Sequence, residues 1–280
     1  MKKLFKKTLL VALVGILALS AAGCGSSTAS STTLSSTPTI DKIKKAGKLV
    51  VGTAADYPPY EFYTENNGST KISGFDMELA NAVAKDLGVK LEIKDMKFDG
   101  LLPALKTNTV DMVIGGMAPT EERKKSVDFS EPYYKAKQSV LIRKEDENKY
   151  KTVEDLKGKS IGAQKSSTQE QIAQTEISNP NLVSIPVFTD LIMELRTKKI
   201  DALVCENTVA KPYTIKYDNL KIVNINFKKS EKDTAIAVNK GKSDLVKRLN
   251  KVIDELIKEN KINTWIDKYS TIASKGIKEQ

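Results

Sequence analysis

The chain of 280 residues contains two cysteines and no histidine, which restricts the chemistry that its side chains can perform. Catalytic relays that use histidine, and zinc sites built from histidine or from four cysteines, are excluded because those residues are missing. Cys205 would be a nucleophile only as a thiolate, and no histidine is present to activate it. We therefore expect Cys205 to be a small buried strand residue. No catalytic residue, cofactor or metal ion is expected.

The other cysteine, Cys24, directly follows a segment with the features of a secretory leader. Four lysines precede an apolar run of 11 residues from Leu9 to Leu19, and small residues follow it. The run is too short to span a bilayer, which requires about 20 residues, so residues 1–23 are predicted to be a signal peptide. The alternative is an uncleaved membrane anchor. The sequence Ala21-Ala22-Gly23-Cys24 resembles the lipobox of bacterial lipoproteins, which implies that Cys24 is acylated and becomes the mature N-terminus.

Serine, threonine and other small residues follow Cys24, and such a composition cannot bury a core. Residues 24–39 are therefore predicted to be a flexible lipidated tether on the extracytoplasmic face of the cell membrane, as in a Gram-positive type of bacterium. Cleavage of the signal peptide removes four lysines and lowers the net charge from +10 to about +6. Lysines are interspersed with acids, as in residues 144–147 and 228–233, so we expect a solvated surface and no nucleic-acid partner.

Side chains that bind a ligand need regular elements to position them, and from residue 48 onward short β-rich runs alternate with helical stretches. This alternation predicts an α/β fold with mostly parallel sheets. Apolar residues spaced three and four apart predict a helix that begins at Asp76 as its N-cap and ends at Gly88. Strands are expected at residues 49–52, 91–93, 110–114, 139–142 and 160–163.

Residues 101–114 and 191–204 share a helix–loop–strand pattern at a constant offset of 90 residues. Any unit of this kind produces such a similarity, and two lobes of similar plan would produce it as well. In the second interpretation, Gly115-Gly116 and Cys205-Glu206 follow equivalent strand ends, where open α/β sheets bind ligands. These two segments are therefore candidate parts of a ligand site.

Six sequence blocks together resemble the extracellular amino-acid-binding proteins of ABC importers, which are solute-binding proteins of family 3. The resemblance extends from about residue 40 to residue 270. The blocks follow one another in family order and are Val51–Phe62 (VGTAADYPPYEF), Gly74–Asp76 (GFD), Phe98–Leu105 (FDGLLPAL), Met117–Lys125 (MAPTEERKK), Val127–Ser130 (VDFS) and Ser167–Glu170 (STQE).

This resemblance implies a clamp of two α/β lobes, the type II periplasmic-binding-protein fold. In each lobe, helices flank a central and mostly parallel sheet, and a hinge of two strands joins the lobes. Lobe 1 is expected to comprise residues 41–134 plus 235–280, and lobe 2 residues 138–229. The ligand would lie between the lobes, where a buried amino acid needs partners for both of its charges because unpaired buried charge is costly.

The matched motifs imply which residues bind the ligand. Arg123 would bind the carboxylate, since its planar guanidinium can donate two parallel hydrogen bonds. Glu206 and the carbonyl group of Gly116 would bind the ammonium group. Asp56 would meet a cationic side chain, and Glu61 would add negative charge at that end. The other predicted ligand-binding residues are Tyr57, Phe98, Gly115, Ala118, Gln164, Thr168 and Gln169.

The function implied by the resemblance is that of a receptor that binds a free amino acid outside the cell. Arginine, lysine, glutamine and histidine are the expected ligands. The implied partners are an ABC permease with its cytoplasmic ATPase, and the membrane through the lipid anchor; a monomer is expected. One alternative is a secreted enzyme of the same fold, a cyclohexadienyl dehydratase-like lyase, with Glu206 as general acid. A second is an anchored adhesin or sensor whose affinity for polyanions falls steeply with salt.

Overall fold

The structure, a computed structural model, describes residues 39–66 and 68–276. All of these residues belong to one compact unit. The predicted signal peptide, the predicted acylation site Cys24 and the predicted tether up to residue 38 lie outside the described residues. Within the described part of the chain, no helix is both long enough and apolar enough to cross a membrane.

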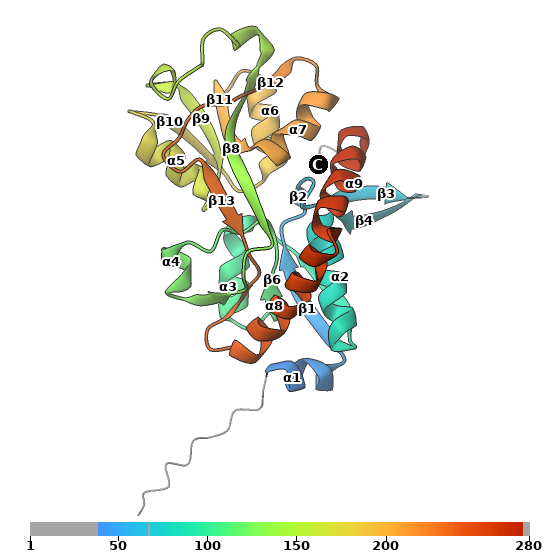
Figure 1. Cartoon of the computed structure of the whole chain (residues 1–280). Coiled ribbons are helices and arrows are strands. Elements are labelled where there is room, and N and C mark those ends of the chain that lie inside the picture. Colours follow the sequence, from blue (N-terminus) through green and yellow to red (C-terminus); the bar gives the residue numbers. More distant parts are fainter. Residues whose placement is uncertain (1–38, 67, 277–280) are drawn as a thin grey trace, which may run out of the picture. The chain divides into compact units, whose positions relative to one another are not determined.

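The first large sheet, whose strands β1 and β6 are labelled in Figure 1, has five strands in the order β5-β1-β6-β14-β7. Strand β1 pairs in parallel with β5 and β6, whereas β14 is antiparallel to both β6 and β7. Four of its five strands therefore run in the same direction, as predicted, although two of the four strand pairs are antiparallel. Its strands are β1 (Lys48–Thr53), β5 (Lys90–Asp95), β6 (Met112–Val113), β7 (Val127–Phe129) and β14 (Ala237–Asn239).

Alternate residues of this sheet pack against helices on opposite faces, because successive side chains of a strand point to opposite sides. Leu49 and Val51 belong to a cluster that also contains buried residues of α2 (Phe75–Leu87) and α8 (Ser243–Lys258). Val50 packs against a second cluster, which contains buried residues of α3 (Leu101–Lys106). Helices on both faces bury this sheet and fix the positions of the loops that follow its strands.

Helix α2 ends as predicted but begins differently. Gly88 caps its C-terminus in the left-handed conformation, with φ 71°. Its N-cap is Gly74 and not Asp76. At this position the backbone has φ 141° and passes close to the backbone of Tyr60, so only glycine fits. A Cβ on Gly74 would lie 1.9 Å from the carbonyl oxygen of Tyr60. Asp76 lies in the first turn and accepts hydrogen bonds from other parts of the fold.

The second large sheet has the order β10-β9-β11-β8-β12, and β13 also pairs with β8. Its strands β10, β9 and β11 are parallel, whereas β8 is antiparallel to β11, β12 and β13. The strands are β8 (Tyr134–Arg143), β9 (Ser160–Gln164), β10 (Asn181–Ile185), β11 (Ala202–Glu206), β12 (Leu220–Val223) and β13 (Glu231–Thr234). Helices again cover the two faces: α5 (Thr168–Glu176) packs on one side, and α6 (Phe188–Arg196) and α7 (Asn207–Lys216) pack on the other.

Two strands carry the chain between the large sheets. Strand β8 follows β7 of the first sheet, and β13 directly precedes β14 of that sheet. Strands β8 and β13 lie side by side in Figure 1. The two are paired with each other at the crossing, with Tyr134 opposite Thr234 and Lys137 opposite Glu231. Beyond the crossing, the second half of β8 pairs with β12, so that Arg143 lies opposite Leu220.

A small antiparallel sheet, which the sequence patterns did not reveal, joins β2 (Asp56–Tyr57), β3 (Glu61–Asn66) and β4 (Ser69–Ser73). Strand β2 contacts α6 of the second large sheet. The other helical elements in the described residues are α1 (Thr39–Ala46), α4 (Glu121–Lys124), α9 (Lys261–Gly276) and the 3₁₀ turns Phe98–Gly100, Lys144–Asp146 and Glu154–Leu156.

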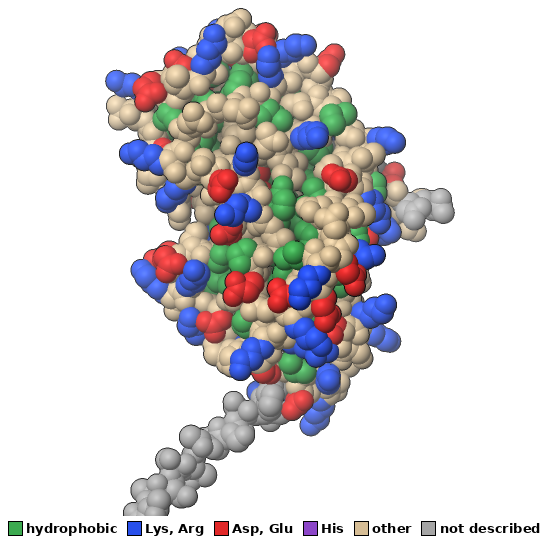
Figure 2. All heavy atoms as spheres, in the orientation of Figure 1, with side chains coloured by type: hydrophobic (Ala, Val, Ile, Leu, Met, Phe, Trp, Pro, Cys, Tyr) green, Lys and Arg blue, Asp and Glu red, His purple; other side chains and the backbone are tan. Residues whose placement is uncertain are grey.

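Aromatic side chains connect the cores of the two large sheets. The rings of Tyr57 and Phe188 meet edge to face with their centroids 4.9 Å apart, and Tyr60 contacts Tyr134 in the same way at 6.1 Å. One apolar cluster therefore extends from α2, which packs on one face of the first sheet, to α6 and α7, which pack on one face of the second. On the outer surface, lysine and arginine are interspersed with acidic residues over the face seen in Figure 2.

Candidate functional site

A small cavity lies among loops that follow strands of both large sheets. Its volume is about 10 Å³, close to the smallest space that one water molecule needs. Nine of the eleven predicted ligand-binding residues line it, and Asp56 and Glu206 do not. The residues that line the cavity are Tyr57, Phe98, Gly115, Gly116, Ala118, Arg123, Gln164, Ser167, Thr168, Gln169 and Lys232.

Arg123 supplies the positive charge at one end of the cavity. It lies in the short helix α4, where the hydroxyl group of Thr120 caps its backbone N–H at 3.3 Å. Its guanidinium group donates to the carbonyl oxygens of Ala118 and Ser166, each at 2.8 Å, and lies 5.5 Å from the ring centre of Phe98. Burial lowers the pKa of this guanidinium to about 10. Within the described residues no carboxylate pairs with it, so this end of the cavity is suited to an anion.

The beginning of α5 adds to the positive character of this end. The side chain of Ser167 caps the helix by accepting from the backbone N–H of Glu170 at 3.1 Å. The first N–H groups of a helix lack acceptors within the helix, and the helix dipole gives its N-terminus a partial positive charge. Because Arg123 donates to Ser166, directly before this helix, the guanidinium and the helix N-terminus lie together. This is the arrangement that binds carboxylates and other anions.

Glu206 supplies the negative charge on the other side, although its side chain lies behind the cavity wall. It ends β11 directly before α7 and is fully buried. The phenol groups of Tyr60 and Tyr57 donate to its carboxylate at 2.6 and 3.1 Å, and the amide of Gln169 donates at 3.4 Å. Burial and the charge of Glu206 raise the pKa of both tyrosines well above the ordinary value, which keeps them protonated as donors.

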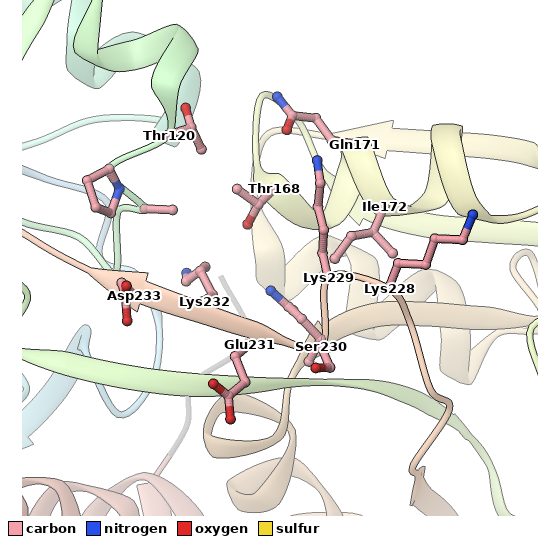
Figure 3. Close-up of a pocket in the computed structure, with 13 residues that line it drawn as sticks. Thr120, Thr168, Gln171, Ile172, Lys228, Lys229, Ser230, Glu231, Lys232 and Asp233 are labelled. Carbon is pink, nitrogen blue, oxygen red and sulfur yellow. The ribbon is translucent and has the colours of Figure 1, made fainter.

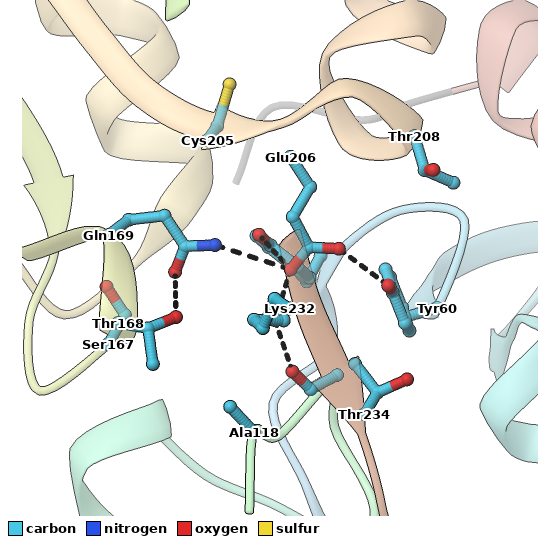
Figure 4. A network of polar contacts seen from close by, with 12 residues as sticks. Tyr60, Ala118, Ser167, Thr168, Gln169, Cys205, Glu206, Thr208, Lys232 and Thr234 are labelled. Carbon is cyan, nitrogen blue, oxygen red and sulfur yellow. Dashed lines mark hydrogen bonds and ion pairs between the residues drawn. The ribbon is translucent and has the colours of Figure 1, made fainter. Parts of the chain in front are cut away.

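Lys232 of the crossing strand β13 lines the cavity and is a partner of Glu206 that the sequence patterns did not predict. Its ammonium group forms an ion pair with Glu206 and donates to the carbonyl oxygen of Gly116 at 2.6 Å (Figure 4). It also lies 5.9 Å from the ring centres of Tyr57 and Tyr60. The expectation that residues 228–233 form a solvated charged run is therefore wrong for Lys232, whose residue surface is only 8% exposed.

Behind the glycine pair lies a buried acidic group, formed by Glu61 and Asp76. Asp76 accepts from the backbone N–H of Gly116 at 3.0 Å and from the phenol of Tyr133 at 2.9 Å, and burial raises its pKa to about 6. Burial and the charge of Asp76 raise the pKa of Glu61 well above its ordinary value. This shift disfavours a charge on Glu61, and the side chain does not line the cavity. Asp76 holds the turn that presents the carbonyl oxygen of Gly116.

Asp56 connects β2 to the second large sheet. Its carboxylate accepts from the backbone N–H of Phe188 at 2.6 Å, and the amide of Gln164 lies 3.4 Å from it. Burial, reinforced by the charge of Asp95, raises the pKa of Asp56 to about 7. The structure therefore places Asp56 behind Gln164, one side chain away from the cavity that it was expected to line.

Cys205 is fully buried in β11, as expected, and burial raises the pKa of its thiol to about 12, so it is not a thiolate at neutral pH. Among the described residues, no group of three or more Cys, Asp or Glu side chains is arranged to hold a metal ion.

Comparison with known proteins places this fold and site in a family. Residues 49–272 match the family described as bacterial extracellular solute-binding proteins, family 3. The chain belongs to this family. The two sheets and crossing strands described above are thus those of a family 3 protein, and the predicted two-lobed type II periplasmic-binding-protein fold is confirmed.

Several family relatives have been named for the ligand that they bind. The arginine-binding extracellular protein ArtP of Bacillus subtilis is 36% identical over 259 residues, which cover 90% of this chain and 92% of ArtP. The structure of the amino acid ABC transporter substrate-binding protein AbpA from Streptococcus pneumoniae, bound to L-arginine, is 36% identical with a TM-score of 0.81 and covers 83% of this chain and 98% of that chain. The ancestral amino acid-binding protein AncCDT-1, a precursor of cyclohexadienyl dehydratase, is 34% identical with a TM-score of 0.75, covering 83% of this chain and 99% of that chain.

Proposed function

We propose that this protein is a receptor that binds a free amino acid outside the cell and delivers it to an ABC importer. The observation that carries the proposal is the pair of charges at the cavity. Arg123 has no carboxylate partner among the described residues, and Glu206 is a fully buried carboxylate on the other side. An α-amino acid carries the complementary charges on neighbouring atoms, so that one small molecule can neutralise both.

The carboxylate of the ligand would bind between Arg123 and the N-terminus of α5. The guanidinium now donates to two uncharged carbonyl oxygens. A carboxylate is a better acceptor, because it carries the opposite charge and can accept two parallel hydrogen bonds from one guanidinium group. Arginine is suited to this role by its planar arrangement of donors, which lysine lacks.

The ammonium group of the ligand would bind to Glu206 and to the carbonyl oxygen of Gly116. These groups already hold an ammonium group, that of Lys232, which supports the chemistry proposed for this position. The rings of Tyr57 and Tyr60 face the same point and attract a cation through their π systems. We call these four groups the ammonium subsite.

A ligand bound in this way would connect two lobes. Arg123 and Gly116 belong to the part of the chain that we assign to lobe 1, residues 41–134 plus 235–280. Glu206 and Thr168 belong to lobe 2, residues 138–229. The paired crossing strands β8 and β13 would act as the hinge. Ligand contacts to both lobes would stabilise the closed form, and the importer would recognise that form.

Polar and cationic amino acids are the proposed ligand class, with arginine as the first candidate and lysine, glutamine and histidine as the others. The names of ArtP and of the arginine-bound AbpA structure support arginine. In this chain, a cationic ligand side chain that displaces the Gln164 amide would reach Asp56. An uncharged polar side chain could instead hydrogen-bond to Gln164.

We further propose that the receptor is a monomer and is attached to the extracytoplasmic face of the membrane by lipid on Cys24. The support for the anchor is the lipobox-like sequence that ends at Cys24. Metabolic labelling with a radioactive fatty acid tests it: labelled protein is expected from the natural chain and none from Cys24→Ser. Label retained by Cys24→Ser would refute the attachment site.

The proposal excludes an enzymatic role for the cavity. General acid catalysis by Glu206 would require a neutral carboxyl group, held so by burial without a cation. In this structure Glu206 forms an ion pair with the ammonium group of Lys232 and accepts hydrogen bonds from two phenol groups, so it is not a carboxyl group without a cation. Incubation with prephenate and arogenate is expected to give no product, and turnover of either would establish the enzyme instead.

Calorimetric titration of the purified protein with each of the twenty amino acids tests the proposed function. Binding of one amino acid, or of a small polar or basic set, is expected, together with a higher melting temperature because the ligand binds only the folded state. Absence of binding to all twenty would refute the proposal.

A further inference from the structure

Lys232 lies where the proposed function puts the ammonium group of the ligand. We infer that Lys232 is an intramolecular competitor: its ammonium group occupies the ammonium subsite in the ligand-free protein and must leave before an amino acid binds. The inference rests on the proposed function and adds to it a residue that sets the affinity.

The contacts of Lys232 are those that a ligand ammonium group would make. Its side chain comes from the crossing strand β13, not from either wall that would move in closure, and it ends between Glu206 and the carbonyl oxygen of Gly116. A buried lysine needs such partners, because an unpaired buried charge is costly. Without a ligand, Lys232 of this strand thus supplies the ammonium group that pairs with Glu206 and Gly116.

Lys232 and a ligand cannot use the subsite together. The cavity beside it measures about 10 Å³, which leaves no space for a second ammonium group. Two ammonium groups at hydrogen-bond distance from one carboxylate would also repel each other, and burial strengthens that repulsion. Binding of an α-amino acid therefore requires the lysine side chain to move away.

A larger groove next to the cavity offers the space into which Lys232 can move. This groove has a volume of about 520 Å³, and Lys232 lines both it and the cavity (Figure 3). Its walls also carry Thr120, Gln138 and Gln171, whose side-chain oxygen atoms can accept from an ammonium group. Because the lysine stem is flexible, we expect rotation about its own bonds to carry the ammonium group into this groove.

With competition of this kind, the apparent dissociation constant equals the intrinsic constant divided by the fraction of molecules in which the subsite is free. If Lys232 occupies the subsite in about nine of ten ligand-free molecules, the apparent dissociation constant is about tenfold higher than it would be without the lysine. Replacement of Lys232 by an uncharged side chain of similar length is therefore expected to tighten binding.

The test compares Lys232→Met with Lys137→Met in calorimetric titrations with arginine. Lys137 lies on β8, opposite Glu231, and is exposed, so its substitution makes the same change in net charge without touching Glu206. We expect arginine to bind about tenfold or more tightly to Lys232→Met, and with unchanged affinity to Lys137→Met. Equal or weaker binding to Lys232→Met would overturn the inference, since it would show that Lys232 does not compete or that it contacts the ligand.

A ligand without the α-ammonium group provides a second arm. The α-desamino analogue of arginine leaves the ammonium subsite to Lys232, so the substitution should not tighten its binding. The preference for arginine over this analogue is therefore expected to increase in Lys232→Met. A preference that stays the same would contradict competition at this subsite.

A double-mutant cycle on the ligand-free protein separates failure of the inference from failure of the proposed function. Glu206→Gln is expected to lower the melting temperature more in the natural chain than in Lys232→Met, because only the natural chain then buries an unpaired ammonium group. Equal effects would overturn the occupied subsite, whatever the protein binds. Unequal effects, with no amino acid bound by the natural chain or by Lys232→Met, would refute the proposed function and, with it, the competition.

Discussion

Replacement of Arg123 by methionine should abolish most of the ligand affinity while it changes the fold little. In the proposed complex, Arg123 is the cation that pairs with the buried ligand carboxylate. Removal of one partner from a buried charge pair costs about 3 to 5 kcal/mol. Because about 1.4 kcal/mol corresponds to a tenfold change in affinity, the dissociation constant should rise roughly 100-fold to several thousand-fold.

The stability of the ligand-free protein should change much less. Arg123 donates to the carbonyl oxygens of Ala118 and Ser166, and its residue is half-buried, so that water can replace the lost donors. Burial also lowers the pKa of the guanidinium, so its removal relieves an unfavourable desolvation. We expect the free energy of unfolding to fall by no more than about 2 kcal/mol.

Calorimetric titration and urea unfolding measure the two quantities on the same preparation. Arg123→Lys keeps the charge but loses the planar pair of donors, so its affinity should lie between those of Arg123→Met and the natural chain. Arg248→Met is the matched control, because Arg248 pairs with Asp86 at 2.7 Å far from the cavity lining and should leave binding unchanged. Binding to Arg123→Met within threefold of the natural chain would refute the carboxylate position.

Three further changes test the fold around the site. Gly74→Ala should lower the free energy of unfolding by about 3 kcal/mol or more, because a Cβ would meet the carbonyl oxygen of Tyr60 at 1.9 Å; a loss below about 1 kcal/mol in urea unfolding would contradict this. The pKa of Asp56 is raised to about 7 in the folded state, so between about pH 4 and 7 the folded protein binds one proton more than the unfolded chain. The free energy of unfolding should therefore fall as the pH rises through this range. Asp56→Asn should make the denaturation midpoint depend less on pH, and an unchanged pH dependence would contradict the assignment. Cys205 should resist alkylation by iodoacetamide at pH 8 until the protein unfolds, and rapid labelling in native mass spectra would show that it is not buried.

The cavity residues could be predicted because they lie in short motifs whose chemistry is local. The block around Arg123 contains its own helix cap, Thr120, and the block that begins at Ser167 contains the residue that starts α5. Residues that line the cavity from such loops depend little on the rest of the chain. The resemblance of these motifs to a known family was therefore enough to select nine residues that line the cavity, and their role in binding stays a prediction.

Lys232 and Asp76 were misjudged because their environments depend on distant segments. Lys232 lies among charged residues in the sequence, and only the pairing of β13 with β8 directs it towards Glu206. Asp76 has the position and chemistry of a helix cap, but Gly116 and Tyr133 provide donors for it inside the fold. The sequence patterns did not predict the small sheet of β2, β3 and β4, because its strands are short and partly polar. Tertiary contacts, not local preference, decide all three cases.

The size of the cavity also determines how fast a ligand can bind. With room for about one water molecule, the space between Arg123 and Gly116 admits no amino acid until the surrounding loops separate. Association must then wait for the protein to open, so the observed rate in stopped-flow mixing should rise with ligand concentration and level off at the opening rate. At high ligand concentration, the opening rate of the receptor, and not diffusion of the ligand, would therefore limit the rate of binding.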